Sequence, residues 1–164
     1  MKKFVFSIIA AVAIGGAIVW QFQHAALAAP QVTFTDLHGQ SVTTQDLRGK
    51  VVLVKFWATS CTTCVAQMPD TIRHYQELSP RGFDTIAVAM QYDPPNYVVN
   101  FAETRKLPFP VVIDATGAIA KAFGDIQLTP TAILIDKQGN IIKRYLGNYN
   151  EQAFMATVEK ALAS

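Results

Sequence analysis

The chain has 164 residues, of which 51% are hydrophobic, and this size and composition suit one globular domain with a short additional segment. Its net charge of +2 comes entirely from Lys2 and Lys3, because acidic and basic residues balance from residue 29 onward. A neutral domain with no internal repeat and no low-complexity tract gives no indication of nucleic-acid binding.

The N-terminal segment begins with Met1, Lys2 and Lys3 and continues in an apolar run of 17 residues from Phe4 to Trp20. A short basic start before such a run is typical of a secretory signal or a single membrane anchor. The run is longer than a signal core of ~7–15 residues and shorter than a spanning helix of ~20, so its length leaves both open.

Residues 26–28, Ala-Leu-Ala, offer a signal-cleavage site, whereas Trp20 stands where an interfacial anchor residue is expected. We favour a retained anchor, and we assign residues 1–28 to a signal peptide or transmembrane anchor and residues 29–164 to the folded domain. Since Lys2 and Lys3 stay on the cytoplasmic side, both interpretations place the domain outside the cytoplasm, anchored to the inner membrane or released into the periplasm.

The folded domain opens with a predicted β-hairpin. Val32 and Phe34 alternate with polar residues, residues 36–40 supply a turn, and Val42 begins the returning strand. Residues 51–57 follow and are apolar except at Lys55, as expected of a strand that is buried on both faces of a parallel sheet.

Cys61 and Cys64 are the only cysteines, and they form a C-x-x-C pair between that strand and a stretch with helical periodicity. Two sulfurs at this spacing close a disulfide with little backbone movement. Cys61 is expected near the helix N-terminus, where unpaired N–H groups favour a thiolate. We therefore predict a redox dithiol in which Cys61 attacks a partner disulfide and Cys64 resolves the mixed disulfide.

Other interpretations of the cysteine pair are weaker. A zinc site needs further ligands, but no second cysteine pair exists and His24, His38 and His74 are scattered, so we expect no metal and no cofactor. A purely structural disulfide is disfavoured because a C-x-x-C between a strand and a helix matches the redox motif. The hydroxyls of Thr62 and Thr63 are candidate hydrogen-bond donors to the thiolate.

Lys55 interrupts the buried strand six residues before Cys61. Its stem can pack at the sheet edge while the amine reaches water, or its charge can stabilise a thiolate. We expect the first arrangement, because an unpaired buried ammonium costs several kcal/mol.

The remaining elements alternate between strands and helices. Apolar spacing predicts a helix after Cys61 with Pro69 inside it, and Asp93 is a candidate cap for another helix. Strands are predicted over 83–90, 109–113, 132–136 and 141–146, and further helices over 96–106, over 118–123 and at the C-terminus. This order predicts an α/β fold, a central mixed sheet with helices on both faces.

The chain resembles the thioredoxin-like domains of TlpA/ResA-type extracytoplasmic thiol–disulfide oxidoreductases over most of residues 32–163. The similarity is carried by Phe-Trp-Ala-Thr at 56–59 before the C-x-x-C pair, by Met68-Pro69, and by Thr-Pro-Thr at 129–131 before a strand. It implies a thioredoxin-like fold with an N-terminal hairpin and an inserted segment over 92–110.

The resemblance also implies site residues. Pro130 is expected to be cis and to lie beside the dithiol, Thr129 to offer backbone hydrogen bonds to a bound peptide, and Trp57 to contribute to substrate binding. In relatives the dipeptide between the cysteines tunes the redox pair, which implies this role for Thr62 and Thr63. Lys55 is a further tuning candidate through its charge, in the second of the two arrangements given above.

The sequence departs from the family pattern at three places. Lys55 stands where thioredoxins have a buried acid and this branch often has Asn, and Gln67 stands where an acidic residue is frequent. The inserted segment of some members carries a Glu near the dithiol, and the nearest acid here is Asp93. Thr62-Thr63 matches neither the Gly-Pro of thioredoxin nor the Pro-His of strong oxidants, so it does not predict the redox direction.

The resemblance implies a reductase of exported cysteine-containing proteins, such as those in cytochrome c maturation, supplied with electrons by a membrane thiol carrier. The alternative is a disulfide-forming oxidase of the same fold. A thiol peroxidase is less expected because Ala58, not Thr, lies three residues before Cys61, and a copper chaperone because no His follows His74.

Overall fold

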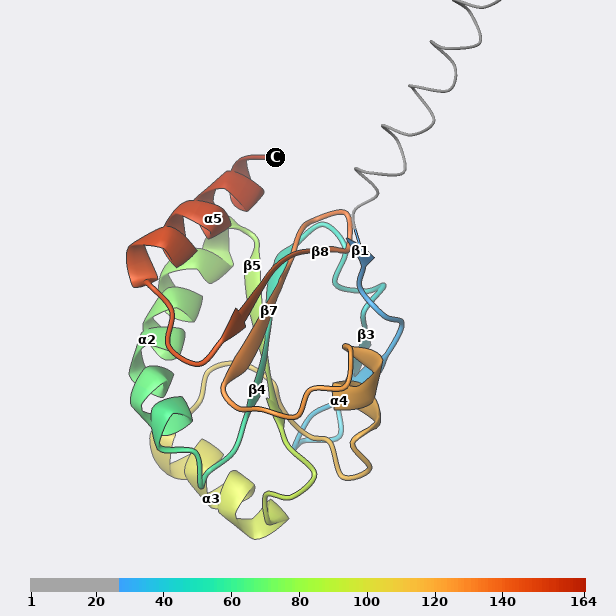
Figure 1. The fold of residues 1–164 in the computed structure, drawn as a ribbon, viewed down its shortest axis with the longest axis vertical. Coiled ribbons are helices and arrows are strands. Elements are labelled where there is room, and N and C mark those ends of the chain that lie inside the picture. The colour runs from blue at the N-terminus through green and yellow to red at the C-terminus, as the bar shows by residue number, and fades with distance from the viewer. Residues whose placement is uncertain (1–26) are drawn as a thin grey trace, which may run out of the picture.

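The computed structural model describes residues 27–164, which form one α/β unit (Figure 1). Its strands and helices follow in the order β1 (Leu27–Ala28), β2 (Thr33–Thr35), β3 (Ser41–Thr43), β4 (Val51–Trp57), α2 (Thr62–Leu78), β5 (Phe83–Ala89), α3 (Pro95–Arg105), β6 (Val111–Ile113), α4 (Ala118–Ala122), β7 (Thr131–Ile135), β8 (Asn140–Leu146) and α5 (Glu151–Ala163).

Six strands form a mixed sheet in the order β1-β8-β7-β4-β5-β6. The central strand β4 is parallel to β5 and antiparallel to β7, so that Val54 lies between Ile86 and Ile133. All seven residues of β4 are buried. The mixed sheet and the buried central strand confirm the predicted architecture.

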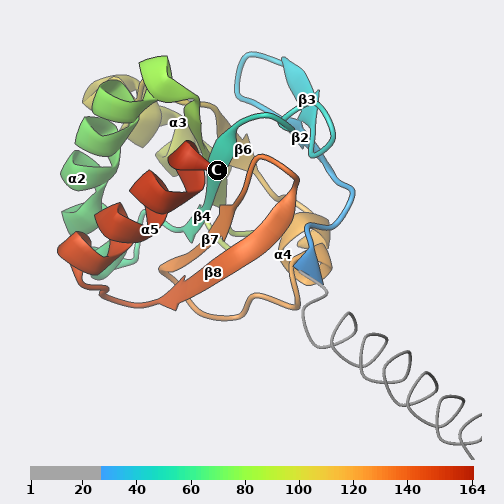
Figure 2. The same cartoon turned by 90° about the horizontal axis from the view of Figure 1, so that it is seen from above.

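Helices cover both faces of the sheet. Helices α2, α3 and α5 lie on one face, while α4 and the separate β2–β3 hairpin lie on the other (Figures 1 and 2). The alternation of side chains along β4 supplies both cores, because Val52, Val54 and Phe56 pack toward α4 and the hairpin. Leu53 and Trp57 pack toward the three-helix face.

The described chain begins in a strand at the edge of the sheet. Leu27 and Ala28 pair with Ile141 and Asn140 of β8, so cleavage after Ala28 would remove this two-residue strand. The predicted signal or anchor falls almost wholly outside the described residues. From residue 27 to residue 164, no helix has the length and apolar character needed to cross a bilayer.

The prediction that Asp93 caps a helix is wrong. Helix α3 begins after Pro94, which makes no side-chain cap hydrogen bond. Asp93 is instead 2% exposed and accepts hydrogen bonds from Thr59, far away in the sequence. In the sequence, an acidic residue just before a helix looks like a helix cap. In the structure, the carboxylate of Asp93 accepts its hydrogen bonds from Thr59 in another loop instead.

Candidate active site

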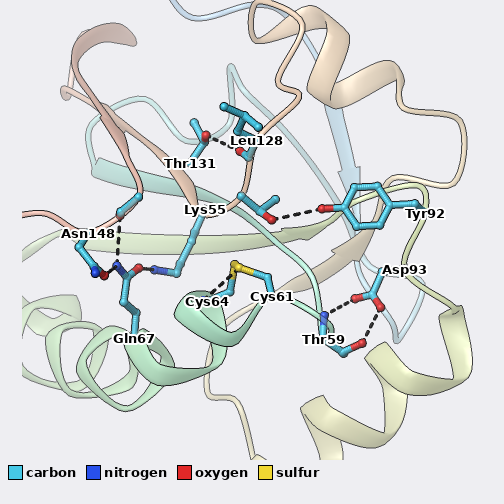
Figure 3. The surroundings of a disulfide bond; sticks show 12 residues. Lys55, Thr59, Cys61, Cys64, Gln67, Tyr92, Asp93, Leu128, Thr131 and Asn148 are labelled. Carbon is cyan, nitrogen blue, oxygen red and sulfur yellow. Dashed lines mark hydrogen bonds between the residues drawn. A yellow bond between two sulfur atoms is a disulfide. The ribbon is translucent and has the colours of Figure 1, made fainter.

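Cys61 and Cys64 form a disulfide at the point where β4 leads into α2, as Figure 3 shows. Cys61 is the N-cap residue of α2, and its Sγ accepts a hydrogen bond from the N–H of Cys64 at 3.2 Å. The two Cα atoms are 5.2 Å apart. The sulfur of Cys61 therefore receives an N–H group of the first helical turn, which favours negative charge on it.

The two cysteines differ in accessibility. Cys61 is partly exposed, whereas Cys64 is 0% exposed and packs in the core cluster that contains Trp57 and Met68. The hydrogen bond to Cys61 Sγ comes from the backbone of Cys64, and within residues 27–164 the hydroxyls of Thr62 and Thr63 make no such contact. An external disulfide can thus reach Cys61 but not Cys64.

The loop before β7 forms one side of the dithiol surface. The Thr129–Pro130 bond is cis, in agreement with the expectation from the family resemblance. In the part of the chain that the structure describes, neither the backbone N–H nor the C=O of Thr129 has a hydrogen-bond partner. Tyr92 Oη lies 3.2 Å from Thr129 Oγ1 and links this loop to the segment before α3 (Figure 3).

Trp57 does not lie where a partner can touch it. Its side chain is 0% exposed and packs against Phe101 of α3, with ring centroids 5.1 Å apart. The expectation that Trp57 contacts a substrate is corrected, because helix α3 packs against it. Tyr92 and Leu128, which are 54% and 62% exposed, present the large apolar surfaces near the dithiol instead.

The expectation that Lys55 reaches solvent is also wrong. Its side chain is 0% exposed, and Nζ donates a hydrogen bond of 2.8 Å to Gln67 Oε1 (Figure 3). Nζ also lies 5.9 Å from the centre of the Tyr149 ring. Burial lowers the pKa of Lys55 to about 8, and the nearby charge of Asp70 opposes part of this shift.

Three residues of this site carry no local signal in the sequence. Tyr92, Asn148 and Tyr149 lie in loops, and nothing in their neighbourhood along the chain distinguishes them from surface residues. Their positions follow from tertiary packing around α2 and the loop of Thr129. No cluster of His, Cys, Asp and Glu side chains suited to a metal ion occurs in residues 27–164.

Comparisons with known proteins agree with this geometry. The Redoxin family model matches residues 24–162. The thiol-disulfide oxidoreductase ResA of Bacillus thuringiensis subsp. konkukian is 35% identical over 133 residues, which cover 80% of this chain and 75% of that protein. ResA of Bacillus subtilis is 30% identical over 123 residues, covering 75% of this chain and 68% of that protein.

Solved structures give the same result. A putative thioredoxin from Neisseria meningitidis superposes with a TM-score of 0.79 at 37% identity, covering 85% of this chain and 92% of that one. A thiol:disulfide interchange protein of the thioredoxin family from Chlorobium tepidum superposes with a TM-score of 0.76 at 28% identity, covering 84% and 97%.

Proposed function

Because the chain belongs to the Redoxin family and is a thiol-disulfide oxidoreductase of the ResA type, we propose that it reduces disulfides in exported proteins. The observation that carries this proposal is the asymmetry of the pair, a partly exposed Cys61 at the start of α2 and a fully buried Cys64. The direction of electron flow follows the TlpA/ResA resemblance. The N-terminal segment holds the domain at the outer side of the inner membrane, and a membrane thiol carrier supplies the electrons.

The reaction proceeds in two exchange steps. The Cys61 thiolate attacks one sulfur of the partner disulfide, forms a mixed disulfide and releases the other partner sulfur as a thiolate. Cys64 then loses its proton and attacks Cys61 Sγ, which releases the second partner sulfur. Two electrons have passed to the partner, and the pair is left as the Cys61–Cys64 disulfide seen here. A dithiol donor reverses the cycle by the same exchange.

The partner lies against the loop of Thr129 in this proposal. The free N–H and C=O of Thr129 are suited to pair with an extended partner backbone, because main-chain hydrogen bonds do not depend on the partner sequence. Pro130 is buried beneath this loop, and its C=O accepts a hydrogen bond from Gly147 N–H at 2.8 Å. The binding edge is thus fixed to the sheet before a partner arrives.

Mixed-disulfide trapping tests the roles of the two cysteines. Cys64→Ser is expected to accumulate complexes with a disulfide-containing protein substrate, and Cys61→Ser is expected to accumulate none. Dithiothreitol must release the complexes. Trapping by Cys61→Ser instead would reverse the assignment of attacking and resolving residues.

The reduction potential tests the direction. We expect the full-length protein, equilibrated with dithiothreitol or glutathione, to give a value near that of thioredoxin, about −270 mV. A value near about −120 mV would make the protein a disulfide-forming oxidase and overturn the proposed reductase role, although the exchange chemistry would stand.

A further inference from the structure

Lys55 is a buried cation on the face of the sheet that carries the dithiol. It lies on β4 between Ala87 of β5 and Ala132 of β7, and these two small residues leave room for its long side chain. It points to the side of the sheet where α2 packs, as Leu53 and Trp57 do. In Figure 3 its side chain extends toward Gln67 on α2, the helix that begins at the Cys61–Cys64 pair.

The hydrogen-bond partner of Lys55 is held in one orientation. Gln67 Nε2 donates to Gly147 O at 3.2 Å and to Asn148 Oδ1 at 3.1 Å, so Gln67 Oε1 is left to face the ammonium. Gln67 lies one helical turn after Cys64 on α2. The segment after β8 therefore aligns an amide dipole, not a carboxylate, against the buried charge.

No carboxylate of residues 27–164 forms an ion pair with Lys55, although the more distant charge of Asp70 acts on it. Asp70 is more than half exposed and pairs with Arg73 at 2.9 Å. Glu151, at the start of α5, also pairs with Arg73. The titratable groups that act on the amine are the Tyr149 phenol and, at longer range, the Asp70 carboxylate.

A buried cation without an ion-pair partner has its largest electrostatic effect on the sulfur that is shielded from solvent. Cys64 lies one turn before Gln67 on α2 and packs in the cluster that contains Ala87, the neighbour of Lys55 on β5. Cys64 is 0% exposed, and burial alone disfavours a thiolate there. A positive charge in the same low-dielectric layer offsets this penalty, since Coulomb interactions are weakly screened away from water.

We propose that Lys55 is a positioning residue of the redox cycle, whose buried ammonium stabilises the thiolate of the reduced Cys61–Cys64 pair. When the disulfide takes up two electrons, one sulfur binds a proton and the other remains a thiolate beside the cation. Stabilising the reduced form makes the pair more oxidising than it is without Lys55. The same charge promotes deprotonation of Cys64 for its attack on the mixed disulfide. The inference rests on the dithiol chemistry of the proposed function but not on its direction.

Two substitutions separate charge from packing. Lys55→Met removes the ammonium and keeps an unbranched side chain, whereas Lys55→Gln also removes the charge but retains a donor for Gln67. Lys143→Met is the matched control, because Lys143 is exposed on β8 and its loss changes the net charge equally. The full-length proteins are equilibrated with glutathione from pH 6 to pH 9, and the thiols of each reduced protein are titrated by their rate of alkylation.

Both Lys55 variants are expected to shift the equilibrium at least tenfold toward the disulfide, or about 30 mV to more negative potential. Below the lower thiol pKa of the pair the equilibrium constant with glutathione does not change with pH, because the two protons released by the protein dithiol are taken up by glutathione. Above that pKa the constant shifts tenfold per pH unit toward the reduced protein while glutathione stays protonated, since the reduced protein then holds one proton fewer. The pH at which the slope changes is expected to be about one unit higher in both variants than in the wild type.

The proposal would be overturned if, in both Lys55 variants, the equilibrium constant and the pH at which its slope changes were the same as in Lys143→Met. Recovery of the wild-type values by Lys55→Gln would also overturn it, because the hydrogen bond and not the charge would then be responsible. If Lys55→Met does not fold, Lys55→Gln decides alone. An absolute potential on the oxidising side would overturn the proposed reductase direction and leave the difference between the variants intact.

Discussion

The carboxylate of Asp93 accepts both hydrogen bonds that Thr59 can donate, from its backbone N–H at 2.6 Å and from its hydroxyl at 2.5 Å. Asp93 is 2% exposed and follows β5, whereas Thr59 lies in the turn two residues before Cys61. These two hydrogen bonds connect the turn before Cys61 to the segment that leads into α3. The position of the attacking sulfur therefore depends on a residue that is distant in sequence and takes no part in exchange.

Asp93→Ala is expected to lower the free energy of unfolding by about 1–3 kcal/mol, because the backbone N–H of Thr59 loses its acceptor in a nearly dry site. Urea unfolding of the oxidised protein measures this. Thr59→Val removes only the hydroxyl bond and is expected to cost less. A loss for Asp93→Ala no larger than that for Asp125→Asn, at an exposed acid, would contradict the assignment.

Lys55 makes the stability of the folded protein depend on pH. Its pKa is about 8 in the fold, whereas an unperturbed lysine has a pKa of 10.5. Below pH 8 both the folded and the unfolded chain hold the proton, and the burial penalty is complete. Between the two values the folded protein releases the proton first, so the unfolded chain binds more protons and stability rises with pH.

The free energy of unfolding of the wild type relative to Lys55→Met is therefore expected to increase by about 2 kcal/mol from pH 7 to pH 10. Urea titrations of both oxidised proteins at the two pH values measure the difference, and groups that titrate in both proteins cancel. A difference that stays constant, or that falls with rising pH, would show that Lys55 is not desolvated as described.

The helices and strands can be predicted from the sequence where they have a clear local pattern of residues. The apolar run of β4, the helical spacing of α2 and the C-x-x-C pair between them place the dithiol without tertiary information. The sequence predicts the wrong environment for Lys55 and Asp93, because distant parts of the chain supply it: Gln67 and Tyr149 around the amine, and Thr59 beside the carboxylate. A polar residue in a strand or before a helix has the same local pattern whether water or a distant donor satisfies it.

Phe154 anchors α5 to the sheet. Its ring is 0% exposed and packs against His74, Tyr145 and Tyr149, with centroid distances of 5.4, 5.5 and 5.1 Å. Phe154→Ala is expected to cost about 3–5 kcal/mol, because the cavity lies among rigid rings that cannot collapse into it. Gln152→Ala, at an exposed position of the same helix, is expected to be nearly neutral in urea unfolding. Equal values for the two variants would contradict this packing.

The exposed side chain of Leu128 lies beside the free backbone of Thr129, at the edge where the proposed partner binds. Leu128→Ala is expected to raise KM for a disulfide-containing protein several-fold, since about 2 kcal/mol is the usual value of burying a Leu side chain and an interface recovers only part of it. Turnover of a small disulfide such as oxidised glutathione is expected to stay unchanged, because it reaches Cys61 without covering Leu128. Ile142→Ala, at a 37% exposed position on β8, is the control. An equal effect on both substrates would assign Leu128 to the dithiol itself and not to partner binding.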